Sequence, residues 1–259
     1  MSTALAHSGY MTGRHLKALA RQPWYLAITL AQPIIWLLLF GALFRRVVEI
    51  PGFTSGSYAD YLTPGIAVMS VVFSAGWSGM GIIEDIDRGV LNHWLVSPVR
   101  RGGLIAGRVL YQAILTVIQT AIILVLGLIV GARFTGGVSS VVVFVVAAVL
   151  LGAAIGSLSD MVGLLSRQQE TLIGASQFVV LPLTFISSAF MPTELSPEWI
   201  QTAARYNPVD WAVQVGHTAL GSGTLDWSLV LSRTGALLAF TLVCGWLAVR
   251  AFRSYQRSA

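Results

Sequence analysis

Charged residues are scarce in this chain: they make up 10% of its 259 residues, whereas hydrophobic residues make up 55%. In soluble domains about a quarter of the residues are charged. The low charge therefore excludes an ordinary water-soluble domain. Apolar runs of about 20 residues, the length that crosses the hydrocarbon core of a bilayer, follow one another with short polar breaks. The sequence predicts an integral membrane protein.

Cysteine is almost absent as well. The single cysteine, Cys244, lies in the last apolar run, so the chain can form neither an intrachain disulfide nor a cysteine-based metal cluster. We expect no bound metal. The net charge of +5 comes from basic residues beside the apolar runs and not from one continuous basic face, which argues against nucleic acid as a partner.

Lysine is equally rare. The only one, Lys17, follows Leu16, whereas the lysine of a nucleotide-binding P-loop directly follows a glycine, because the glycine-rich backbone wraps the phosphates that the lysine neutralises. The sequence thus excludes a Walker A site. We expect that this chain is not an enzyme and binds no cofactor of its own.

Some glycines imitate known motifs without completing them. Gly79 and Gly81 have the spacing that opens a dinucleotide-binding loop, but Glu84 stands where the third glycine belongs. We interpret this pair as small residues for helix packing. Gly152 and Gly156 form a small-xxx-small pattern, which we also assign to packing within the chain more readily than to a dimer seam.

The apolar runs predict an all-α integral membrane fold with six transmembrane helices in a single domain. The expected spans are 24–44, 62–83, 104–130, 138–164, 172–190 and 228–250. Before them, residues 8–21 carry Arg14, Lys17 and Arg21 opposite Leu16 and Leu19, which predicts an amphipathic helix at the membrane interface. Most Arg and Lys residues then fall on the side of the N-terminus. Because cytoplasmic segments hold the excess of these residues, we expect both termini in the cytoplasm.

Ionisable residues are nearly absent from the middle of these spans. Asp160, near the cytoplasmic end of the fourth span and close in sequence to Arg167 and Glu170, is the best candidate for an ion or proton pathway. A single residue of this kind gives little support for ion-coupled transport.

Two spans carry side chains that suit a path for a lipophilic substrate. Thioether and aromatic groups adapt to such molecules, although the same stripes would also fit helix packing or lipid contact. The candidates on the second and fifth spans are Met69, Phe73, Trp77, Phe178, Phe185 and Ser188.

The cytoplasmic connection 84–103 is too long to be a simple turn. It has charges at its start, Leu91, Trp94 and Leu95 at helical spacing, and Pro98 at its end, a pattern that predicts a short amphipathic helix. Either it is an ordinary solvated helix or it is a docking surface for a cytoplasmic partner.

The external connection 191–227 is too apolar for a free loop and too broken for a span. We expect short hairpin helices that dip into the outer leaflet, where tryptophan and tyrosine favour the interface. They would act either as a plug over an exit or as an anchor. The residues that mark this segment are Pro192, Trp199, Asn207 and Pro208.

Three stretches of the sequence, taken in order along the chain, match the pattern of a known family. The first is MTGRHLKALARQPWYLAITLAQPIIWLLLFGALF, the second contains Asp87, Arg88, Gly89, Leu91, Leu95, Ser97, Pro98 and Val99 followed by Gly107 and Arg108, and the third is LPLTFISSAFMPTELSPEWIQTAARYNPVDWAVQVGHTALGSG. In this order, and over nearly the whole chain, they resemble the permeases of type 2 ABC exporters, in the branch related to the daunorubicin-resistance permeases.

This resemblance implies a single permease domain over residues 1–259 that pairs with a second permease, identical or related, and with two separate ABC ATPase subunits. ATP and magnesium would bind to those subunits. In the family, the loop between spans two and three forms a coupling helix that rests on the ATPase. The docking candidates carried over are Asp87, Arg88, Gly89, Leu91, Trp94, Leu95 and Pro98.

The resulting hypothesis is a permease subunit in a bacterial cytoplasmic membrane that exports a lipophilic drug or lipid-like substrate, as in drug efflux and antibiotic resistance. A polysaccharide or glycolipid exporter is an alternative within the family. An ion-coupled secondary transporter and a membrane anchor or scaffold are alternatives outside it.

Overall fold

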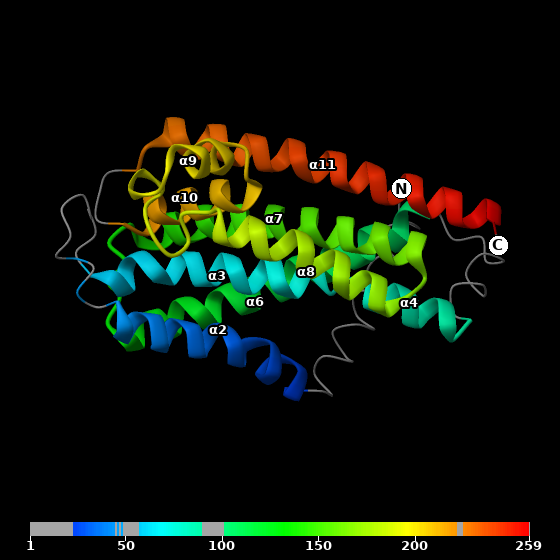
Figure 1. The fold of residues 1–259 in the computed structure, drawn as a ribbon, viewed down its shortest axis with the longest axis horizontal. Coiled ribbons are helices and arrows are strands. Elements are labelled where there is room, and N and C mark those ends of the chain that lie inside the picture. The colour runs from blue at the N-terminus through cyan, green and yellow to red at the C-terminus, as the bar shows by residue number, and fades with distance from the viewer. Residues whose placement is uncertain are drawn as a thin grey trace.

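The computed structural model describes residues 23–44, 46, 48, 57–89, 101–221 and 225–258, and among these residues it contains helices and no strand (Figure 1). The interfacial helix expected at 8–21 lies outside the described residues. The elements are α2 (Pro23–Leu43), α3 (Tyr58–Gly76), α4 (Met80–Asp87), α6 (Arg101–Val130), α7 (Gly137–Ser166), α8 (Gln169–Phe185), a 3₁₀ turn (Thr193–Leu195), α9 (Glu198–Arg205), α10 (Pro208–Leu220) and α11 (Trp227–Ser258).

Four stretches are long and apolar enough to cross a membrane. They are Tyr58–Asp87, Gly107–Val130, Gly137–Ser166 and Trp227–Tyr255, and Ala27–Leu43 is a shorter apolar helix. These four correspond to the second, third, fourth and sixth expected spans. The prediction of an all-helical membrane protein is therefore confirmed for the part of the chain that the structure describes.

The long helices lie side by side along the longest axis of the molecule (Figure 1). α3 and α7 are the central elements: α3 contacts α2, α6, α7, α8 and α10, and α7 contacts α3, α4, α6, α8, α10 and α11. Most residues of α3 are buried. α9 and α10 lie at one end of the bundle, whereas α4 and the last turns of α11 lie at the other. We call these the hairpin end and the loop end.

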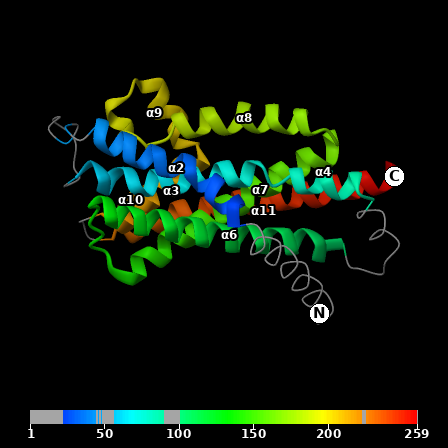
Figure 2. The same ribbon diagram turned by 90° about the horizontal axis from the view of Figure 1, so that it is seen from below.

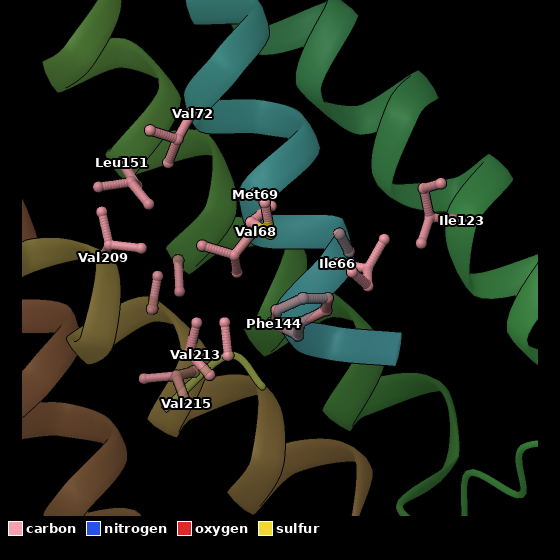
Figure 3. Packing of buried hydrophobic residues seen from close by; sticks show 14 of the residues in the cluster. Ile66, Val68, Met69, Val72, Ile123, Phe144, Leu151, Val209, Val213 and Val215 are labelled. Atoms are coloured by element: carbon pink, nitrogen blue, oxygen red, sulfur yellow. The ribbon is translucent and has the colours of Figure 1, made fainter. Parts of the chain in front are cut away.

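A large apolar core joins α3, α7 and α10 (Figure 3). There Ile66 and Val72 of α3, Phe144 of α7, and Val209 and Val213 of α10 belong to one buried cluster. Two short helices, α9 and α10, lie within the segment where hairpin helices are expected, and α10 is part of the core.

A glycine allows α10 to approach this core. A side chain on Gly216 would lie 2.7 Å from the ring of Phe144 and 2.8 Å from Pro64. Glycine is therefore the residue that lets α10 pack directly between α3 and α7.

The second expected span is interrupted. Residues 77–79 form a turn that separates α3 from α4, although hydropathy runs on without a gap. The fifth expected span also stops early, because α8 ends at Phe185 and residues 186–192 form turns. The turn at 77–79 contains Trp77 and the turns at 186–192 contain Ser188, two of the candidate site residues.

Candidate functional site

A groove runs along α3 between α2 and α8; in Figure 2, α2 crosses α3 and α8 lies to one side of it. It consists of two adjoining hollows that are open to the surface. Gln32 of α2 and Phe73 of α3 line both hollows, so the two form one continuous feature. We call it the α2–α8 groove.

The groove lining is apolar and aromatic with a few polar groups. Trp36, Met69 and Phe73 line the first hollow, and Phe73, Trp77 and Gln177 line the second. None of the residues that line either hollow is ionisable. Such a surface suits a flat lipophilic molecule that offers one or two hydrogen-bonding groups.

The structure places the substrate-path candidates in three different settings. Met69, Phe73 and Trp77 line the groove. Phe178 and Phe185 lie on the exposed side of α8, with exposed fractions of 82% and 59%. Ser188 is buried, and both its backbone N–H and its hydroxyl donate to Asp210.

Sequence reasoning missed the polar groups of the groove. Thr29 and Gln32 come from α2, and Ser176 and Gln177 come from α8. The sequence did contain a signal for them, because an amide in the middle of an apolar helix needs a hydrogen-bond partner that lipid cannot supply. Gln32 and Gln177 are such amides, and both are exposed on the groove side.

The turn at 77–79 is held by serines of α7 and α8. The carbonyl of Gly76 accepts from the Ser159 hydroxyl at 2.6 Å and from the Ser176 hydroxyl at 2.7 Å. The N–H of Gly79 donates to the Ser159 oxygen at 2.9 Å. These bonds replace helical bonds that the interruption removes. Trp77, which lines the groove, is the first residue of this turn.

A buried ionic cluster lies just below the turn, toward the loop end. Arg108 of α6 is 3.3 Å from Asp160 of α7 and 3.5 Å from Asp85 of α4, and it donates to the carbonyl of Ser78 at 2.8 Å. The Ser78 hydroxyl donates to Asp160 at 2.9 Å. Asp160, the candidate for an ion pathway, is therefore ion-paired within the chain. We call these four residues the Arg108 cluster.

The interpretation of Gly79 and Gly81 as packing residues agrees with the geometry. A side chain on Gly79 would overlap the carbonyl of Ser159, and one on Gly81 would lie 3.0 Å from the Arg108 guanidinium. Gly152 and Gly156 likewise face Thr116 and Gln112 of α6, which is packing within the chain.

Three of the docking candidates, Asp87, Arg88 and Gly89, belong to the described residues. Asp87 ends α4, Arg88 pairs with Glu84 at 3.5 Å on the exposed side of that helix, and Gly89 has φ of 68°. A glycine in this left-handed conformation is a common way to end a helix. Leu91, Trp94, Leu95 and Pro98 lie outside the described residues.

The hairpin is tied to the bundle by buried hydrogen bonds. Asp210 of α10 accepts from Ser188 through one oxygen and from Gln214 through the other. Tyr61 of α3 donates to the carbonyl of Ser188 at 2.7 Å. Burial raises the pKa of the Asp210 carboxyl, and the hydrogen bonds from Ser188 act in the opposite direction.

The expected hairpin residues have distinct positions. Asn207 caps α10 by accepting from Val209 and donates to the carbonyl of Leu183 at 2.6 Å. Pro208 is the first residue of α10, where no N–H is needed. Pro192 precedes the 3₁₀ turn, and Trp199 of α9 is 66% exposed. Asn207 thus joins the hairpin to the end of α8.

A family model described as ABC-2 type transporter matches residues 8–218. Over 228 residues the chain is 27% identical to a daunorubicin resistance ABC transporter permease protein of Streptomyces coeruleorubidus, which covers 87% of this chain and 80% of that one. It is 25% identical over 256 residues to a probable doxorubicin resistance ABC transporter permease protein of Mycobacterium tuberculosis, covering 98% and 90%. Nodulation protein J of Rhizobium leguminosarum bv. trifolii is 26% identical over 229 residues, covering 86% and 84%.

Proposed function

The chain belongs to the ABC-2 type transporter family, and from that premise we propose that it is the permease subunit of an ATP-driven exporter of lipophilic drugs or lipid-like molecules. The observation that carries the proposal is the α2–α8 groove, which is lined by Met69, Phe73 and Trp77 and contains no ionisable side chain. A substrate held there would be bound by apolar contact and by the amides of Gln32 and Gln177.

The family implies ABC ATPase subunits as partners. Two of them would bind ATP and magnesium, which accords with the lack of a glycine–lysine pair in this chain. The segment from Asp87 to Pro98 is the docking site in this proposal. It would form a coupling helix whose apolar Leu91, Trp94 and Leu95 rest on the ATPase, within a rim of charges.

The membrane arrangement in this proposal has six spans, with α2 and α8 as the first and fifth. α8 has 17 residues, about 26 Å of helix, and the turns after it complete the crossing. Arg88 directly follows α4, Arg167 directly follows α7, and Arg253 belongs to the last turns of α11. These ends of the three helices lie at the loop end (Figure 1). The positive-inside rule then makes that end cytoplasmic, with both termini there. The host membrane would be a bacterial cytoplasmic membrane.

A second permease, identical or related, would cover the α2–α8 side. The amides of Gln32 and Gln177 are exposed on this side. In contrast, the exposed large side chains of α6 include Leu110, Val117 and Val125, which suits lipid. Contact with lipid is costly for an amide, so a partner protein is the better neighbour for α2 and α8. Phe178 and Phe185 would then face the paired permease and complete the path.

The second candidate substrate is a polysaccharide or glycolipid. The aromatic rings in the groove favour it, because sugars stack on such rings. Ion-coupled transport has less support, since Asp160 is paired with Arg108 at 3.3 Å. Daunorubicin and a fluorescent glycolipid are the two probes that separate these classes of substrate.

The transport test uses proteoliposomes that hold the full chain together with its co-purified ATPase. We expect ATP to drive daunorubicin movement, and no movement with an ATPase whose P-loop lysine is replaced. Phe73→Ala should lower the transport rate, because it removes an aromatic side chain common to both hollows. Daunorubicin movement by the chain alone, under an imposed proton gradient, would contradict the ATPase-driven function.

The docking test is co-purification of the ATPase with tagged chain. Leu91→Asp or Trp94→Asp should abolish association, because each places a charge in an apolar contact. Trp199→Asp is the matched control at the hairpin end and should leave association unchanged. Undiminished binding of the ATPase by both loop variants would overturn the docking assignment.

A further inference from the structure

The Arg108 cluster lies where the two stems of the coupling loop meet. α4 leads into the loop and α6 leads out of it. Arg108 of α6 pairs with Asp85 of α4 at 3.5 Å, and the same guanidinium donates to the carbonyl of Ser78, just before α4, at 2.8 Å. One side chain therefore holds both stems.

A third contact joins these stems to the rest of the bundle. Asp160 belongs to α7, which packs against α3, α6, α10 and α11. The side chains of Arg108 and Asp160 are only 11% and 5% exposed, so the pair is shielded from solvent. Both stems, α4 and α6, pack against α7, and the ion pair adds a buried polar contact between α6 and α7.

The position of this contact along α3 matters for the groove. Ser78, whose carbonyl Arg108 holds, directly follows Trp77, whose side chain lines the groove. Residues 77–79 interrupt the helix between α3 and α4. A movement of α4 relative to α3 would therefore turn the chain at this interruption and displace the indole of Trp77.

We propose that Arg108 is a positioning residue that transmits displacement of the coupling loop to the groove wall at Trp77. This inference rests on the proposed function, in which ATPase subunits move the loop. Arginine suits the role because three different nitrogens of its planar guanidinium make these contacts: Nε with Asp160, Nη1 with Asp85, and Nη2 with the Ser78 carbonyl. A lysine at this position would keep the charge, but all its donors belong to one nitrogen atom, which cannot take the place of three separate ones.

The experiment separates transmission from simple stabilisation. Arg108→Gln leaves the Asp160 carboxylate buried without its cation, and Asp160→Asn removes one of the two carboxylates that pair with Arg108, so each should lower the melting temperature of the complex. The double variant, Arg108→Gln with Asp160→Asn, removes both charges of the buried pair and leaves only the more exposed Asp85, so it should regain part of that loss. Arg108→Lys is a further variant that retains the charge at this position. Arg253→Gln, exposed at the same end of the molecule, is the matched control.

Each variant is assayed as the complex with its ATPase in proteoliposomes, with daunorubicin as the probe. We expect the double variant and Arg108→Lys to bind the ATPase and hydrolyse ATP at the wild-type rate, while daunorubicin transport per ATP falls about tenfold. Transport that recovers together with stability in the double variant would overturn the inference, as would loss of ATPase binding. If the wild-type complex moves no daunorubicin with ATP, the proposed function fails first, and this inference fails with it.

Discussion

Single buried polar residues give the first prediction. Gln119 of α6 is fully buried, and neither its amide oxygen nor its amide nitrogen has a hydrogen-bond partner among the described residues. Each unpaired buried group costs about 1–3 kcal/mol. Gln119→Leu, of similar volume, should therefore raise the free energy of unfolding by roughly that amount.

Thermal unfolding of the purified protein in detergent measures this change. Gln32→Leu is the matched control, because Gln32 is exposed on α2 and its replacement should shift the melting temperature little. A lower melting temperature for Gln119→Leu would mean that the amide of Gln119 makes stabilising contacts that the described structure does not contain.

At the scale of the residue, the sequence was enough to single out notable polar residues. It was not enough to identify the residues with which they form ion pairs or hydrogen bonds. Asp160 was identified as the notable carboxylate, but Arg167 and Glu170 were its expected neighbours because they are close in sequence. Its partner Arg108 is 52 positions away. Hydrophobic periodicity locates a helix and one of its faces, and it contains no information on which remote residue meets that face.

Close packing between elements gives the second prediction. The turn before α4 meets α7 at Gly79, where an added side chain would overlap the Ser159 carbonyl. Gly79→Ala should push the two helices apart and lower the free energy of unfolding by about 1–3 kcal/mol, the usual cost of overpacking. Because the Ser78 carbonyl is adjacent, transport should fall as well.

Gly174→Ala is the matched control for this change. Gly174 lies within α8, and an added side chain there would meet no atom within 4 Å. Alanine should therefore stabilise that helix, by up to about 1 kcal/mol. Melting temperatures that move in the same direction for both variants would contradict the steric explanation.

At the scale of the element, the positions of the helices could be predicted and their interruptions could not. The run 62–83 was expected as one span, because Trp77, Ser78 and Gly79 leave its hydropathy intact. The interruption depends on the hydroxyls of Ser159 and Ser176, which satisfy the Gly76 carbonyl from other helices. The end of α8 is similar, since Asn207 of the hairpin donates to the Leu183 carbonyl in its last turn.

For the molecule as a whole, composition and segment length were enough to predict the helical membrane class. Composition and segment length could not predict that α10 is buried. Its sequence is too short and too interrupted to count as a span, and its place in the core depends on Gly216 facing Phe144 and Pro64. Three of the substrate-path candidates meet in the groove, yet the polar groups from α2 and α8 become visible only once the helices are packed.

The last prediction concerns the assembly of two permeases. The α2–α8 side exposes both Gln32 and Gln177, whereas the exposed large side chains of α11 include Leu231, Leu242 and Val243. Because an amide is costly to expose to lipid, a second copy should cover α2 and α8, and lipid should cover α11.

Single cysteines placed on these two surfaces test this arrangement. In a Cys244→Ser background, Phe178→Cys and Leu242→Cys place thiols at sites whose native side chains are 82% and 66% exposed. A short bis-maleimide should link two copies through Phe178→Cys and leave Leu242→Cys monomeric on a denaturing gel. Linking through Leu242→Cys alone would place the interface on α11. The α2–α8 groove would then face lipid and not a second permease, and the path would have to form within one chain.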